Sequence, residues 1–162
     1  MDEFIIPISF VVSTLSYGLM AKWYVMPALR AKSGNEAFLP ILFLHSFRYI
    51  GLAFLIPGIT SEALDLRFAN PAAYGDLIAS ILAIISIIAL KYHWSIAIAL
   101  VWIFNIEGTL DLLNAVFQGL KYVPVSDFGS TFFIPAVIVP ALLVSHFMVF
   151  ILLIKKPNEH KS

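Results

Sequence analysis

Five long apolar segments, separated by short polar breaks, limit most strongly what this chain can fold into. They cover residues 4–28, 37–58, 72–91, 94–120 and 130–154. Each is close to the length of about 20 residues that a helix needs to cross the hydrocarbon core of a bilayer. A chain of 162 residues cannot hide this much apolar surface in its own core. The pattern predicts one all-α domain, an integral membrane protein with a bundle of about five transmembrane helices.

Composition supports this class and excludes others. The chain is 60% hydrophobic and 12% charged, whereas soluble domains are about 45–50% apolar and about 25% charged. Its net charge of zero gives no electrostatic support for a nucleic-acid partner. The absence of cysteine excludes disulfides, iron–sulfur ligation and thiolate catalysis. The expected surroundings are therefore a lipid bilayer.

Charged residues at the segment ends predict an orientation. The first segment follows Asp2 and Glu3 rather than a basic region, so we expect a retained span and not a cleaved signal peptide. One set of ends carries Arg30, Lys32, Lys91, Lys155, Lys156 and Lys161, and the other carries Arg67 and Lys121. By the positive-inside rule, the N-terminus lies outside and the C-terminus in the cytoplasm, with the protein in the cell (plasma) membrane.

Small residues mark the faces on which the helices are expected to pack. In the third segment they are Gly75, Ala79, Ala83 and Ser86, and in the first they are Ser9, Ser13 and Ser16. Helix association in lipid depends on close packing and interhelical hydrogen bonds, and small side chains permit both. These stripes are predicted to face the bundle interior.

Capping residues and prolines predict interruptions. Thr60 or Ser61 could cap a short outer helix that ends at Asn70-Pro71, and an ordinary connecting loop is the equally favoured alternative. In the fifth segment, Pro135 and Pro140 each remove a helix hydrogen bond, so its outer half is expected to be kinked.

The stretch LHSFRYIGLAF, residues 44–54, places a histidine and an arginine inside the second apolar segment. Arginine is not deprotonated in proteins, so Arg48 at mid-depth requires a counter-charge. Glu107 is the nearest carboxylate in estimated depth and Asp111 the second. An ion pair that only fixes the register of two helices is the alternative interpretation.

The fourth segment supplies the carboxylates on one face. Glu107, Asp111, Asn114 and Gln118 follow at i, i+4, i+7 and i+11. Carboxylates are costly in hydrocarbon, so this face is predicted to point into the bundle. His146 stands alone among the apolar residues of the fifth segment.

Estimated depths suggest a buried polar column. At 1.5 Å per residue, His45 and His146 both lie about 12 Å from the cytoplasmic end, Arg48 about 16 Å and Glu107 about 20 Å. The two histidines would form the inner tier, and Arg48 with Glu107 the middle. Asp111, Asn114 and Asp76 would form the outer tier, with Asp76 near water at the end of its span.

Such a column is typical of proton relays and small-solute paths. We therefore expect a site of Arg48, Glu107, Asp111, His45, His146 and Asn114 that binds or relays a proton, ion or small ligand. Five short spans make a small transporter, so a homo-oligomer or other membrane subunits are expected as partners.

Two alternatives remain open. The chain could be a structural or assembly subunit of a larger membrane complex, because no extramembrane domain fits between the segments. It could hold haem b between His45 and His146, since two level histidines are the minimum for bis-His ligation. A metal site using those histidines with Glu107 and Asp111 is disfavoured, because the depths differ by about 8 Å. No serine lies in a nucleophile-elbow context, so a hydrolase is disfavoured.

Overall fold

The computed structural model describes residues 4–32 and 34–155. Helices account for 85% of the described residues, which contain no strand. Within these described ranges, four helical units are long and apolar enough to cross a membrane: Ile5–Arg30, Leu66–Lys91, Ala97–Tyr122 and Ile134–Lys155. The predicted all-α class is confirmed, while four rather than five of the segments form such long helices.

The first unit consists of α1 (Ile5–Met20), the π-helical turn η2 (Ala21–Val25) and α2 (Met26–Arg30). Pro27 cannot donate a backbone hydrogen bond and its ring crowds the carbonyl four residues back, which accounts for the widened turn before it. None of the residues of α1 is buried, and Ser16 is exposed although Ser9 and Ser13 are half-buried. The predicted serine stripe therefore holds only in part.

The second unit is where the prediction of a regular spanning helix is wrong. After the 3-10 turn η3 (Gly34–Ala37), α3 (Leu39–His45) is followed by the 3-10 helix η4 (Arg48–Leu55). At about 1.5 Å per α-helical residue and about 2.0 Å per 3-10 residue, α3 and η4 rise by about 10 and about 16 Å. The tighter, longer-pitched η4 lets this short segment extend along most of the bundle.

The third and fourth units are the two long helices α4 (Leu66–Lys91) and α5 (Ala97–Tyr122). Asp65 caps α4, since its side chain accepts a hydrogen bond from the backbone N–H of Arg67. The predicted short helix capped at Thr60 or Ser61 is wrong, because α4 begins at Leu66 and continues through Pro71. The small-residue stripe of this segment is confirmed, with Ala79, Ala83 and Ser86 fully buried.

The fifth unit starts in the loop segment η5 (Val125–Phe132) and continues through the π-helical turn η6 (Ile134–Ile138) into α6 (Val139–Lys155). The interruption expected from Pro135 and Pro140 is this π-helical turn. Pro140 crowds the carbonyl of Ala136 and lacks the N–H that would bond to it, which favours the wider turn.

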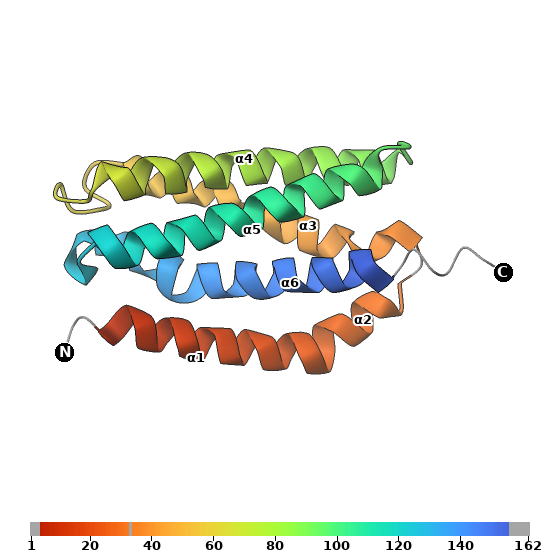
Figure 1. Cartoon of the computed structure of the whole chain (residues 1–162), viewed down its shortest axis with the longest axis horizontal. Helices are drawn as coiled ribbons and strands as arrows, with labels where there is room; N and C mark the ends of the chain where they lie inside the picture. Colours follow the sequence, from red (N-terminus) through yellow and green to blue (C-terminus); the bar gives the residue numbers. More distant parts are fainter. Residues whose placement is uncertain (1–3, 33, 156–162) are drawn as a thin grey trace.

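The long helices run along the bundle, with α5 between α4 and α6, and α1 packed on the far side of α6 (Figure 1). The segment of α3 and η4 packs on α4. The beginning of α1 and the end of α6 lie at opposite ends of the bundle (Figure 1). This arrangement agrees with an odd number of passes.

Two apolar cores fill the bundle, one toward each end. The core nearer the end of α6 contains Leu42, Phe104 and Val149, and the other contains Phe68, Leu112 and Leu142. On α4, α5 and α6, the buried residues between these two cores include polar residues and a glycine: Asp76, Ser80, Asn105, Gly108, Ser145 and His146. The sequence of each helix therefore brings its polar residues to one level, near the middle of the bundle.

Candidate functional site

Arg48 is the centre of the polar level and is 2% exposed. Its Nε donates to Asp76 Oδ1 at 2.8 Å, and its Nη2 donates to Asp111 Oδ2 at 2.6 Å. Its Nη1 lies 3.3 Å from the carbonyl oxygen of Gly108 and 3.3 Å from Nε2 of His146. Every nitrogen of the guanidinium thus has an acceptor, as burial of a permanent charge requires.

The prediction that Asp111 pairs with Arg48 is confirmed, and the prediction that Glu107 is the nearest partner is wrong. Asp76 takes that place. It lies 10 residues into α4, or about 15 Å, because the helix starts at Leu66 rather than near residue 72. Asp76 is therefore buried at mid-depth, and not near water at the end of a span.

Three glycines make room for this cluster. A Cβ at Gly51 would collide with the carboxyl group of Asp76, and one at Gly75 would collide with that of Asp111. A Cβ at Gly108 would lie 2.7 Å from Arg48 Nη1. Each charged side chain thus rests against backbone that carries no side chain, which is the close approach that glycine permits.

The two histidines meet, as their equal depth predicted. Their ring centroids are 4.2 Å apart, and both are 1% exposed or less. Asn105 donates through Nδ2 to the carbonyl of His146, so its Oδ1 accepts from His146 Nδ1–H at 2.8 Å. His146 Nε2 is then the acceptor for Arg48, which fixes the neutral tautomer of this imidazole.

His45 is held by Ser145. The hydroxyl of Ser145 donates to the carbonyl of Leu142, so it accepts from His45 Nε2–H at 2.8 Å. The other ring nitrogen of His45, Nδ1, is buried without a hydrogen-bond partner among the described residues.

This geometry does not fit bis-His haem ligation. Axial ligands must face each other across a porphyrin plane, whereas the two imidazoles are in direct contact. Phe104 also packs against both rings, at 5.0 Å from His45 and 5.2 Å from His146. Among the described residues, no group of three or more histidine, cysteine or acidic side chains has the arrangement of a metal site.

Ser80 supports the break between α3 and η4. Its hydroxyl donates to the backbone carbonyl of Ser46 at 2.5 Å, just where α3 ends and η4 has not begun. A carbonyl freed from a helix inside an apolar environment needs such a donor. Ser80 therefore holds the chain in the turn that presents Arg48 to its partners.

Two of the expected site residues lie outside the hydrogen-bonded cluster. Glu107 is half-buried, makes no ion pair among the described residues, and has one buried oxygen, Oε2, without a partner. Asn114 is exposed and accepts only a long hydrogen bond from Gln118, at 3.4 Å. The inward face of α5 is instead Phe104, Asn105, Gly108 and Leu112, so Asn114 does not form an outer tier.

The sequence analysis missed Asn105, Ser145, Ser80, Gly51 and Gly108, and it predicted Gly75 only as part of a packing stripe. Asn105 had a usable signal: with Val101, Gly108 and Leu112 it follows a period of about 3.6 residues on the buried face of α5. The carboxylates Glu107 and Asp111 on the neighbouring face of α5 gave a stronger polar pattern than Asn105. The serines and glycines gave no comparable signal, since such residues are frequent at any helix contact in lipid.

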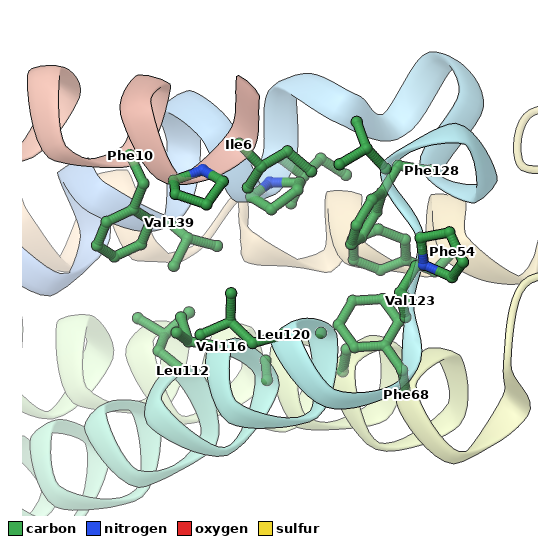
Figure 2. A pocket seen from close by; sticks show the side chains of 18 of the residues that line it. Ile6, Phe10, Phe54, Phe68, Leu112, Val116, Leu120, Val123, Phe128 and Val139 are labelled. Atoms are coloured by element: carbon green, nitrogen blue, oxygen red, sulfur yellow. The ribbon is translucent and has the colours of Figure 1, made fainter. Parts of the chain in front are cut away.

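A cavity of about 480 Å³ adjoins the cluster on the side of η5. Ile6 and Phe10 of α1 line one side and Leu112, Val116 and Leu120 of α5 the opposite side (Figure 2). Among the described residues that line it, Asp76 has the only polar side chain. The cavity is therefore apolar except at Asp76, one carboxyl group of the Arg48 cluster.

Three phenylalanines lie together toward one end of this cavity. Phe54, Phe68 and Phe128 lie together in Figure 2 and pack edge to face, with ring centroids 5.1 to 6.4 Å apart. On α4, Phe68 and Asp76 are the first and last lining positions, eight residues or about 12 Å apart. The cavity is therefore elongated along the helices, with aromatic rings at one end and the carboxyl group at the other.

The fold is an all-helical bundle. Near its middle, Arg48 has an acceptor for every guanidinium nitrogen, and an apolar cavity extends to its partner Asp76. The chain belongs to a family described as a domain of unknown function (DUF8737), whose model matches residues 5–154. No curated protein and no solved structure matches the chain.

Proposed function

We propose that this is a multipass membrane protein that binds a small, mostly apolar molecule within the bilayer, with the polar end of that molecule at Asp76. The observation that carries the proposal is the cavity. Ligand pockets are typically about 300–1,000 Å³, largely apolar, with a few polar groups that orient the ligand. A volume of about 480 Å³ with one carboxyl group among apolar side chains has that character.

In this proposal the Arg48 cluster is the support of the site and not its anion-binding group. Every guanidinium nitrogen already has an acceptor, so an anionic ligand would have to displace Asp76 or Asp111. Arg48 instead fixes the carboxyl group of Asp76 at the end of the cavity. His146 and Asn105 hold the opposite side of the guanidinium in turn.

We further propose five passes through the plasma membrane, with the N-terminus outside. The four long helices cross it, and α3 with η4 makes the shorter fifth pass. The chain lacks cysteine, so single cysteines report sidedness without a background. A membrane-impermeant maleimide should label Ser130→Cys in intact cells and Ser95→Cys only after permeabilisation. The reverse pattern contradicts the orientation, and labelling of both in intact cells contradicts the passes.

Cavity occupancy is tested with two tryptophan variants of α5. Val116 lines the cavity, whereas Leu113 is 53% exposed on the outer surface of the bundle. Native mass spectrometry of protein released from nanodiscs should detect a bound small molecule in the wild type and in Leu113→Trp. Val116→Trp should lose at least tenfold in occupancy. Equal occupancy in both variants contradicts a ligand in this cavity.

A structural subunit of a larger membrane complex is the second candidate function. It is favoured by the surface of α1, none of whose residues is buried, and by the exposed amide of Asn114 on α5. Partner subunits would cover both. Co-purification of another membrane protein at fixed stoichiometry after mild solubilisation supports this function, and a stable isolated protein that binds ligand opposes it.

A further inference from the structure

We infer that the ligand is a single-chain amphiphile whose head group donates hydrogen bonds, a hydroxyl or a protonated amine, and not an anionic head group. This inference rests on the proposed function. It concerns only which chemistry the end of the cavity at Asp76 accepts.

The head-group preference follows from which polar atoms remain available. Among the described residues, the hydrogen bond between Arg48 and Asp76 uses only Oδ1 of the carboxyl group, and no hydrogen bond involves Oδ2. An ionised carboxylate accepts hydrogen bonds and donates none. A hydroxyl or ammonium group at this position would therefore satisfy Asp76, while a carboxylate or phosphate would find no free donor.

The charges around the Asp76 end of the cavity also disfavour an anionic head group. One guanidinium, that of Arg48, lies among three carboxyl groups, those of Asp76, Asp111 and Glu107. Asp76 and Asp111 are paired with it, and Glu107 has a buried oxygen without a partner. An anionic head group would be repelled at short range in an apolar environment, where Coulomb interactions are strong. A cationic head group would be attracted.

The tail class follows from the shape of the cavity. It extends about 12 Å along α4 from Asp76 to Phe68, and its remaining lining is apolar. The edge-to-face rings of Phe54, Phe68 and Phe128 lie toward the far end. A single straight alkyl chain of about that length fits this outline better than a branched or two-chain lipid.

Three probes with one tail separate the head groups: decylamine, decanol and decanoate. They are titrated into the full-length protein in nanodiscs, at a pH between the pKa values of carboxylic acids and amines, so that both ionisable head groups are charged. Native mass spectrometry gives the bound fraction of each. Decylamine and decanol should bind at least tenfold more tightly than decanoate. Decanoate binding as tightly as either of the others overturns the inference.

The role of the carboxyl group is tested with Asp76→Asn. Asp111 remains as the charged partner of Arg48, and the asparagine side-chain oxygen can still accept from Nε. The preference for decylamine over decanoate should fall at least fivefold. Asp127→Asn removes the same charge in η5, outside the cavity lining, and should keep the preference. An unchanged preference in Asp76→Asn contradicts the assignment of Asp76 as the head-group acceptor. If this variant does not fold, the comparison of the three probes on wild-type protein still tests the head-group preference.

The outcomes separate the two proposals. Binding of all three probes with equal affinity, lost in Val116→Trp, overturns the head-group inference and supports the proposed function. Binding of no probe to wild-type protein, together with no co-purified ligand, overturns the proposed function itself.

Discussion

Arg48 connects its own segment, η4, to three helices through buried polar contacts. It belongs to η4, its carboxylate partners to α4 and α5, and its imidazole partner to α6. Removing one member of a buried ion cluster typically costs about 3–5 kcal/mol, because the remaining charges are left without compensation, whereas replacing all the charges together is often close to neutral.

Arg48→Met alone should therefore lower the free energy of unfolding by about 3–5 kcal/mol. The triple variant Arg48→Met, Asp76→Asn, Asp111→Asn removes the uncompensated charges and should recover most of that loss. Equilibrium unfolding of the purified proteins measures both. A triple variant less stable than the single one would contradict charge compensation, because the two carboxylates would then stabilise the fold even without Arg48.

The glycines that receive the carboxylates give a second residue-level prediction. Gly75→Ala places a methyl group against Asp111, so it should lower the free energy of unfolding by about 1–3 kcal/mol, as overpacking does. Gly18→Ala is the matched control in α1, since a Cβ there has no atom within 4 Å. It should be neutral or slightly stabilising. Equal effects of the two substitutions on the unfolding temperature would contradict the packing account.

At the scale of elements, the start of α4 decided how well the site could be predicted. Asn70-Pro71 is typical of a helix end, so the span was predicted to begin near residue 72. Asp76 was therefore predicted to lie near the end of that span. Asp65 caps a longer helix, and Pro71 is tolerated because the carbonyl it leaves free, that of Arg67, lies in the exposed first turn. The hydropathy pattern predicted the mid-helix positions of the other charged residues. It could not predict the break between α3 and η4, because the donor that stabilises this break, Ser80, belongs to another helix.

The cap of α4 gives a prediction about pH. Arg67, hydrogen-bonded to the side chain of Asp65, holds the pKa of Asp65 below its ordinary value. A lowered pKa in the folded state means that the stabilisation is present at neutral pH and is lost as pH falls through that lowered pKa. Hydrogen exchange of the first turn of α4 should increase over that acidic range. Asp65→Asn keeps a good cap and should lose this pH dependence; the same dependence in both proteins would contradict it.

At the scale of the whole molecule, the proposed membrane insertion would place amides on the outer surface of α5 where lipid offers no hydrogen-bond partner. Asn114 is exposed eight residues before the end of α5, or about 12 Å inside the bundle end. Asparagine and glutamine carry both donors and acceptors and stabilise helix contacts in lipid. We expect Asn114 and Gln118 to pair with the same residues of a second copy.

Asn114→Cys should then crosslink to a dimer in membranes under mild oxidation, because the chain has no other cysteine. Val12→Cys is the matched control: it is 56% exposed and lies at a similar depth, but on α1. Crosslinked mass is read by gel electrophoresis or mass spectrometry. Equal crosslinking at both positions indicates random collision, and crosslinking at Val12 alone would place the contact on α1.

Asp76 is proposed to bind the head group of an amphiphile that lies in the cavity. The most direct measurement is a structure of the protein in nanodiscs with a decylamine probe brominated at the end of its tail. We expect the amine within hydrogen-bonding distance of the Asp76 carboxyl group and the bromine beside Phe68 and Phe128. An empty cavity at saturating probe, or a probe bound in it with the bromine beside Asp76, would contradict the account.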